Sequence, residues 1–239
     1  MVDVTLRYFP ALGRAQALRD VLYEAASVDV GIRFNELRVP LEEWRNHKTD
    51  PSFAGPFQSL PTLTWGDVTL AETLPIAGFL SRQLGHYEDL SAAQIARMEA
   101  IVSCCYVDVT IMVGMAIWGE VLFPGTTVEA GAERIVPRML SKLARVEAQL
   151  PESGWLGGAQ PQVADFFVFE AYESVSLLLG SDRSEPLRAR LPSLAAFAER
   201  MRARPALAAN WAQRPAHFSG SGDEHAMLQR IWQAPLSMI

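Results

Sequence analysis

Cysteine is nearly missing from this chain, which has only two, the adjacent Cys104 and Cys105. Neighbouring cysteines rarely bridge, so the sequence excludes a framework of disulfides. The four histidines show no metal-ligand spacing, so we expect no metal. Glycine-rich phosphate-binding motifs are also missing, which argues against a nucleotide-binding loop.

An excess of positive charge is missing as well, because 21 Lys and Arg face 27 Asp and Glu, for a formal charge of −6. A nucleic-acid binder needs clustered cations to displace counterions from phosphate, and docking on anionic lipid needs them too. The arginine-rich stretch 183–204 also contains Glu185 and Glu199, which indicates a solvated helix face. We therefore expect neither a nucleic-acid partner nor a membrane partner.

Long apolar runs are the third absence. The most apolar stretch, residues 109–119, lies between Asp108 and Glu120, whereas a membrane-spanning helix needs about 20 apolar residues. The first residues, MVDVTLRYF, do not have the pattern of a signal peptide. With 239 residues, 49% of them apolar, the chain can bury a sizeable core in one or two domains. The composition predicts a cytoplasmic globular protein.

Hydrophobic periodicity divides the chain into two predicted domains. Residues 1–84 have the order βαβ-ββα, with elements at 2–7, 14–26, 30–38, 62–65, 68–70 and 73–84. A βαβ unit predicts a parallel strand pair, to which the hairpin around Gly66 and Asp67 adds antiparallel strands. The polar stretch 40–56 is predicted to be a long functional loop.

Residues 85–90 are predicted to be a linker, because they are short, polar and contain glycine. Residues 91–239 are predicted to form an all-helical domain, with helices at 91–119, 128–150, 164–179, 187–204 and 226–232. The Gly/Ser-rich stretch 217–224 is predicted to be flexible and to precede the last short helix.

Three segments have recognisable residue patterns. In LRYFPALGRAQALRDVL, Tyr8 ends a strand and Arg14 follows six residues later. In EEWRNHK, Trp44 and Lys48 are four residues apart. In FQSLPTLTWGDVTLAETLPIAGFL, Pro61 precedes a strand and Glu72-Thr73 precede a helix. With the domain order, these segments resemble the cytosolic glutathione transferases of the tyrosine-type classes, most closely the sigma class.

The resemblance implies a thioredoxin-like N-terminal domain that binds and ionises the thiol of glutathione. Such domains normally use a CxxC motif, and its absence after the first strand argues against disulfide exchange. A free thiol is only about 3% ionised at pH 7, and lowering its pKa by about two units takes roughly 2.7 kcal/mol. One hydrogen bond to a charged group supplies roughly 1.5–3 kcal/mol. Tyr8 is therefore the implied catalytic donor, with Arg14 adding positive charge.

The resemblance also implies the residues that hold the rest of glutathione. Thr73 at a helix N-terminus would bind the γ-glutamyl carboxylate, and Glu72 would accept from the ammonium. A cis bond before Pro61 would let the backbone of Leu60 meet the cysteinyl part. The full implied set is Trp44, Lys48, Ser59, Leu60, Pro61, Glu72, Thr73 and Asp108.

Two members of that set raise questions. Ser59 stands where the family usually has an amide or basic residue. Asp108 is the best candidate for the aspartate that reaches the γ-glutamyl ammonium in the partner subunit, which implies a homodimer. Trp44 and Lys48 would hold the glycyl carboxylate, unless they are a half-buried tryptophan and a solvated lysine.

The second substrate implied by the family is a small hydrophobic electrophile. Its predicted walls are Phe9, Leu12, Tyr106, Thr110, Val113 and Gly114, and the last helix, with Ile231 and Trp232, is predicted to form a lid. The apolar stripe Val109, Val113 and Ile117 is alternatively ordinary core, and each single wall residue fits a core position at least as well. Two other functions stay open, a non-catalytic protein that binds glutathione or apolar ligands and a glutathione-dependent isomerase.

Overall fold

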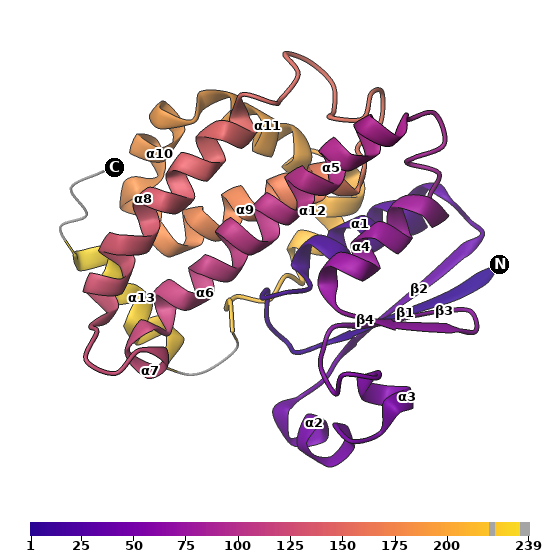
Figure 1. The fold of residues 1–239 in the computed structure, drawn as a ribbon, viewed down its shortest axis with the longest axis horizontal. Helices are drawn as coiled ribbons and strands as arrows, with labels where there is room; N and C mark the ends of the chain where they lie inside the picture. Colours follow the sequence, from indigo (N-terminus) through magenta and orange to yellow (C-terminus); the bar gives the residue numbers. More distant parts are fainter. Residues whose placement is uncertain (220–222, 235–239) are drawn as a thin grey trace.

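A computed structural model describes residues 1–219 and 223–234, and Figure 1 shows its α/β unit beside a larger helical unit. The N-terminal sheet has the strand order β2-β1-β3-β4. Its strands are β1 (Val2–Tyr8), β2 (Ile32–Arg38), β3 (Thr62–Trp65) and β4 (Val68–Ala71). β1 is parallel to β2 and antiparallel to β3, which confirms the predicted βαβ-ββα arrangement.

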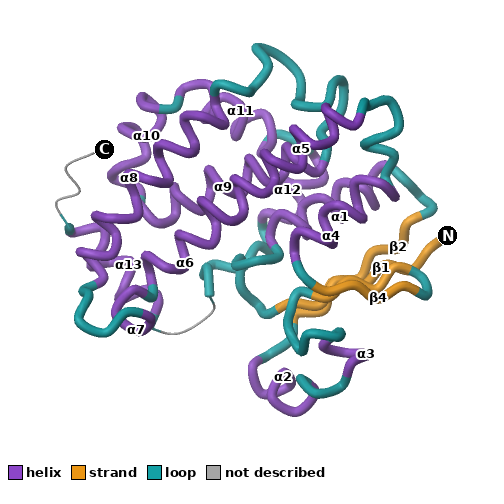
Figure 2. The backbone as a smooth tube through the Cα atoms, in the orientation of Figure 1, coloured by secondary structure: helices purple, strands orange, loops and turns teal. Residues whose placement is uncertain are grey.

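Helices α1 (Gln16–Val28) and α4 (Thr73–Gln83) cover one face of this sheet, as Figure 2 shows. The apolar face of α1 is buried, including Leu18, Val21 and Leu22. Along β1 the burial alternates, so that every second side chain enters the core between sheet and helices.

The prediction of one long loop over residues 40–56 is wrong. The segment contains α2 (Leu41–His47) and α3 (Pro51–Ala54), which form a separate lobe on the other side of the sheet (Figure 1). α2 buries no residue, so it has no apolar stripe from which periodicity could predict it. α3 begins with Pro51 at its first position, and the side chain of Asp50 accepts from the Ser52 N–H.

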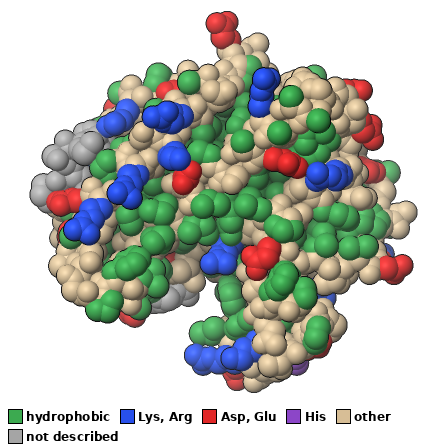
Figure 3. All heavy atoms as spheres, viewed as in Figure 1, with side chains coloured by type: hydrophobic (Ala, Val, Ile, Leu, Met, Phe, Trp, Pro, Cys, Tyr) green, Lys and Arg blue, Asp and Glu red, His purple; other side chains and the backbone are tan. Residues whose placement is uncertain are grey.

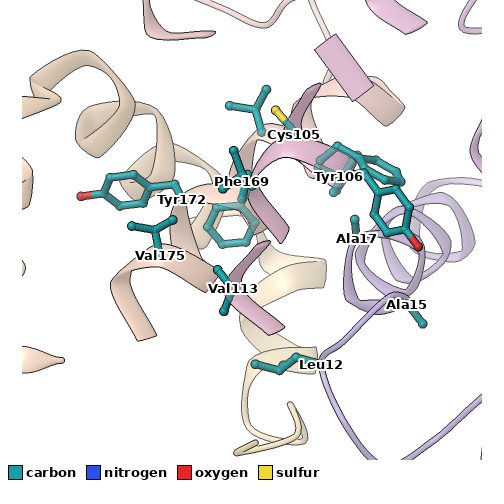
Figure 4. Packing of buried hydrophobic residues seen from close by; sticks show 14 of the residues in the cluster. Leu12, Ala15, Ala17, Cys105, Tyr106, Val113, Phe169, Tyr172 and Val175 are labelled. Atoms are coloured by element: carbon teal, nitrogen blue, oxygen red, sulfur yellow. The ribbon is translucent and has the colours of Figure 1, made fainter. Parts of the chain in front are cut away.

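The helical unit is built around α9, which is buried along most of its length. Its elements are α5 (Ala92–Cys105), the π-helix η1 (Tyr106–Thr110), α6 (Ile111–Ile117), α7 (Gly119–Leu122), α8 (Val128–Glu147), α9 (Val163–Leu179), the 3₁₀ turn η2 (Ser181–Arg183), α10 (Ser184–Arg190), α11 (Pro192–Arg202), α12 (Pro205–Trp211) and α13 (Glu224–Gln233). Figure 4 shows Phe169 and Val175 of α9 in the same core as Val113 of α6.

The helical prediction is correct in kind and wrong in detail. The predicted helix 91–119 contains a π-turn, and the predicted helix 187–204 is broken before Pro192, since proline removes a helical hydrogen bond. The predicted helical domain also includes residues 235–239, which lie outside the described residues, as do 220–222 of the predicted flexible stretch.

Residues 92–117 form the one helix in the described ranges that is long and apolar enough to cross a membrane by length and composition. About 39% of its most apolar stretch is buried inside the protein. It packs against α8 and α9, and its remaining surface faces away from the core of this chain.

Candidate active site

Tyr8 lies at the end of β1 with only 8% of its surface exposed. Its hydroxyl oxygen accepts a hydrogen bond of 3.0 Å from the backbone N–H of Arg14, so the O–H proton stays available for another acceptor. Burial raises the pKa of Tyr8, while the Arg14 N–H and the charges of Arg14 and Arg19 work against this rise. Tyr8 is therefore a neutral hydrogen-bond donor at physiological pH.

Gly13 makes room for that hydroxyl, and the sequence interpretation missed it. Its φ is +40°, in the left-handed region, and a Cβ on it would lie 2.4 Å from the Tyr8 oxygen. Only glycine satisfies both conditions without displacing Tyr8. The sequence offered a clue, because a glycine directly before the predicted site residue Arg14 indicates a turn that a larger residue cannot easily make.

Arg19 of α1 is the second residue that the sequence interpretation missed. Its guanidinium is buried, lies 5.4 Å from the centre of the Tyr8 ring and forms an ion pair of 2.8 Å with Glu36. It also donates to the carbonyl groups of Phe9 and Ala11, at 2.9 and 2.7 Å. Arg19 therefore fixes the loop between β1 and α1. An arginine on the apolar face of a predicted helix was the available signal.

The N-terminus of α4 faces the same loop. Thr73 begins this helix, as predicted, and its hydroxyl donates to the carbonyl of Arg14 at 3.0 Å. Glu72 precedes it with φ +72°, a strained conformation for a residue with a side chain. Ser59 donates to the Glu72 carboxylate at 2.9 Å, so these two predicted residues contact each other.

The bond between Leu60 and Pro61 is cis, as predicted. Arg7 pairs with Thr62 in the antiparallel register of β1 and β3, and extending this register by one residue sets Pro61 beside Tyr8. Leu60 is buried, and its backbone N–H and C=O have no protein partner among residues 1–219 and 223–234. They are free to pair with a ligand beside Tyr8.

Aromatic contacts connect the lobe of α2 to the site. The rings of Tyr8 and Phe9 lie 5.4 Å apart edge to face, and Phe9 contacts Trp44 at 5.8 Å. Lys48 follows the end of α2 and is exposed, with its N–H donating to the carbonyl of Trp44. Figure 3 shows a hollow between this lobe and the helical unit, with one cationic and one acidic side chain at its inner end.

Asp108 is not brought to the site of its own chain. Its carboxylate pairs with Lys142 of α8 at 2.7 Å, and both side chains are 43% exposed. Tyr106, two residues earlier, is buried and faces the polar part of the site, with its phenol beside the Thr73 hydroxyl. Tyr106 was predicted in the apolar wall.

The other predicted wall residues remain on the apolar side. Leu12, Thr110 and Val113 are buried, whereas Phe9 and Gly114 are half-buried. Figure 4 shows Leu12, from the N-terminal unit, on the side of α6 that bears Val113.

The predicted lid is not formed by α13. Ile231 is fully buried, and the indole N–H of Trp232 donates to the carbonyl of Leu177, because α13 packs against α8 and α9. The segment before α13 approaches the site instead, where the carbonyl of His217 accepts from the N–H of Leu12 at 2.9 Å. The described part of the predicted flexible stretch is thus fixed to the protein.

Tyr8 and Thr73 both bond to the backbone of Arg14, and Glu72 directly precedes Thr73, so a neutral O–H donor, a helix N-terminus and a carboxylate lie near one loop. Such a set can hold a zwitterionic peptide and stabilise a thiolate. Within the described ranges, no three His, Cys, Asp or Glu side chains form a group able to hold a metal ion.

Comparisons with known proteins find a matching family model and similar curated proteins. Residues 122–214 match the family model of the glutathione S-transferase C-terminal domain. Human glutathione S-transferase P is 30% identical over 216 residues, which covers 87% of this chain and 91% of that protein. S-crystallin SL20-1 of Nototodarus sloanii is 29% identical over 107 residues, 44% of either chain.

Solved structures share the fold. Monomeric Na-GST-3, from the hookworm Necator americanus, has a TM-score of 0.71 and 23% identity, over 89% of this chain and 98% of its own. A Nu-class transferase from Haemonchus contortus has a TM-score of 0.66 and 25% identity, over 91% of this chain and 100% of its own.

Proposed function

The chain belongs to the glutathione S-transferase family, and we propose that Tyr8 is the residue by which it activates the thiol of glutathione. The thiolate attacks an apolar electrophile, so that a sulfur–carbon bond forms while a leaving group departs with its electron pair. The thiol proton passes to solvent, and Tyr8 keeps its own.

One observation above all supports this proposal: the Tyr8 oxygen accepts from the Arg14 N–H, which turns its O–H proton toward another acceptor. A hydrogen bond from Tyr8 to the sulfur favours the thiolate over the thiol. The raised pKa of Tyr8 keeps the phenol protonated, as a donor must be. The positive charge of Arg14 favours the thiolate further.

The remaining predicted residues fit the other parts of glutathione. The N-terminus of α4 at Thr73 suits the γ-glutamyl carboxylate, and Glu72 suits the ammonium. The free backbone groups of Leu60, beside the cis Pro61, suit the cysteinyl part. Ser59 acts through Glu72, because its hydroxyl donates to that carboxylate.

The lobe of α2 and the helical unit complete the proposed site. Trp44 and Lys48 suit the glycyl carboxylate, with Trp44 held by its contact with Phe9. The half-buried Phe9 and Gly114 and the buried Leu12 and Val113 form the apolar wall for the electrophile. We assign residues 1–84 to a domain that binds glutathione and residues 91–239 to a helical domain that contributes to the electrophile site.

We further propose a cytoplasmic, sigma-like homodimer that acts in detoxification. The exposed apolar side of the helix 92–117, including Val107 at 45% exposure, supports a second copy as its cover. Asp108 lies on this helix, which is consistent with a role in the partner subunit's site. Its carboxylate forms an ion pair with Lys142 of the same chain.

The experiment that tests the proposal is Tyr8→Phe, assayed with a chloroaromatic electrophile. We expect turnover at pH 6.5 to fall about ten- to hundredfold, because a hydrogen bond of about 1.5–3 kcal/mol to the thiolate is lost. The deficit shrinks at alkaline pH, where the thiol ionises unaided. Retention on immobilised glutathione controls for folding.

Two outcomes contradict the proposal in different ways. Unchanged turnover of Tyr8→Phe at pH 6.5 removes Tyr8 from the mechanism. Binding of glutathione by the wild type without turnover of any electrophile favours a non-catalytic binding protein.

A further inference from the structure

Phe218 lies in the segment between α12 and α13, which Figure 1 shows passing between the two units. Its ring is only 7% exposed. A Cβ on Gly114 would lie 3.0 Å from the Phe218 Cε1 atom, so the ring covers this glycine of α6 directly. The carbonyl of His217, the residue before Phe218, accepts a hydrogen bond from the backbone N–H of Leu12. Phe218 therefore contacts the wall predicted for the electrophile.

The position of Phe218 is fixed by a buried carboxylate. Glu224, the first residue of α13, is fully buried, and it accepts from the backbone N–H groups of Phe218 and Ser219. α13 itself is anchored, since Leu228 and Ile231 enter the core and Arg230 forms ion pairs with acidic residues of α7 and α8. The ring is thus held against Gly114 by a rigid element.

We propose that Phe218 determines the size of the electrophile that the enzyme accepts, a proposal that rests on the function proposed above. Its ring covers Gly114 and belongs to the same buried apolar cluster as Leu12 and Val113. A side chain at position 114 would contact the ring tightly, because its Cβ would lie 3.0 Å from the Phe218 Cε1 atom. The wild-type pocket therefore selects compact electrophiles, and removing the ring admits larger ones.

Two glutathione conjugates test this directly, S-benzylglutathione and the larger S-(1-naphthylmethyl)glutathione. They share the peptide and differ only in the group that enters the pocket. In Phe218→Ala, we expect the affinity for the naphthylmethyl conjugate, relative to the benzyl conjugate, to rise at least tenfold in titration calorimetry. Turnover of naphthylmethyl isothiocyanate relative to benzyl isothiocyanate rises in parallel, as the sulfur adds to the central carbon and the nitrogen takes a proton.

Matched variants show whether a change in the affinity ratio comes from a larger pocket or from a general loss of stability. Phe218→Leu keeps apolar volume and gives a smaller rise, which guards against misfolding of the alanine variant. Phe123→Ala removes an exposed aromatic side chain after α7 and leaves the affinity ratio unchanged. Gly114→Ala lowers the melting temperature of the wild type but not of Phe218→Ala, because the clash needs both groups.

The outcomes distinguish this proposal from the proposed function. An unchanged affinity ratio in both Phe218 variants, with both conjugates bound, overturns the role of Phe218 alone. Failure of the wild type to bind either conjugate overturns the glutathione site and the proposed function with it. A melting temperature that Gly114→Ala lowers equally in both backgrounds also overturns the role of Phe218.

Discussion

At the scale of single residues, the candidate site depends on a turn at Gly13 where any Cβ would displace the Tyr8 hydroxyl. Gly13 has φ +40° and stands where a Cβ would lie 2.4 Å from the Tyr8 oxygen. The next residue, Arg14, supplies the N–H that this oxygen accepts. The direction of the Tyr8 O–H group is therefore set by its two neighbours in the loop.

Gly13→Ala tests this dependence. We expect kcat/KM to fall at least tenfold and the pKa of the bound thiol, followed by thiolate absorbance, to rise toward that of free glutathione. Gly66→Ala is the matched control, because Gly66 also has a positive φ, +55°, with its nearest neighbour a side-chain methyl at 3.7 Å. Both variants lose stability from backbone strain, about 1 kcal/mol or more. Equal loss of activity in both would refute a specific contact between Gly13 and Tyr8.

The sequence predicted the local structure of the candidate site better than the distant contacts that hold it in place. Tyr8, Thr73 and the cis Pro61 belong to patterns of neighbouring residues, so a single sequence contains them. Arg19 acts through Glu36, 17 residues away, and through carbonyl groups of the loop. Such contacts exist only in the folded chain, and no local pattern predicts them.

At the scale of elements, a buried polar contact joins α1 to α12 across the two units. Asn210 donates to one oxygen of Asp20 at 3.2 Å, and Gln16 donates to the same oxygen at 2.9 Å. The other Asp20 oxygen and the Asn210 oxygen are buried and have no hydrogen-bond partner within the described part of the chain. Burial raises the pKa of Asp20 to about 6, while the charge of Arg214 opposes the rise. Folding therefore favours the protonated acid.

This contact makes stability depend on pH. Because the folded pKa exceeds the ordinary value of 3.8, the cost of burying the carboxylate is absent below about pH 4 and fully present above pH 6. Asp20→Asn removes the titrating group and supplies a donor, so we expect it to raise the free energy of unfolding at pH 8 by about 1–3 kcal/mol, and by less at pH 5. Urea unfolding at both values measures the difference.

The control for this prediction is Asp67→Asn, in the exposed turn between β3 and β4. Its effect on unfolding is expected to be the same at pH 5 and pH 8. A gain for Asp20→Asn that is equal at both pH values would contradict the assignment of the titration to Asp20. Burial raises the pKa of Glu170 to about 7 and the charge of Asp20 raises it further, so the gain of Asp20→Asn at pH 8 includes relief of this repulsion.

Helices and strands with one buried face could be predicted from the sequence, because burial leaves a periodic pattern of apolar residues, whereas those without a buried face could not. β1, α1 and α9 have strong apolar patterns and were found. α2 buries nothing, so its sequence resembles a loop. The π-turn at Tyr106–Thr110 holds an extra residue in one turn, which rotates the side chains around it. Tyr106, predicted in the apolar wall, lies at the start of this turn with its phenol beside the Thr73 hydroxyl.

At the scale of the whole molecule, two exposed apolar surfaces lie on different units. One is the outer side of the helix 92–117, and the other is Phe57, which follows α3 and is 68% exposed. Exposed apolar surface of this kind is costly in a monomer and is usually covered by a partner. We propose that the dimer pairs the N-terminal unit of one copy with the helical unit of the other, which covers both surfaces.

We expect light scattering coupled to size-exclusion chromatography to give the mass of two chains for the wild type and of one chain for Phe57→Glu. The substitution introduces a charge that the interface would have to bury without a partner, which costs several kcal/mol. Val30→Glu, at a site 91% exposed in the turn between α1 and β2, should leave the mass unchanged. Because Asp108 is proposed to act in the partner subunit's site, Phe57→Glu should also weaken binding of glutathione. A wild type of single-chain mass, matching the monomeric state of Na-GST-3, would place Asp108 outside the mechanism.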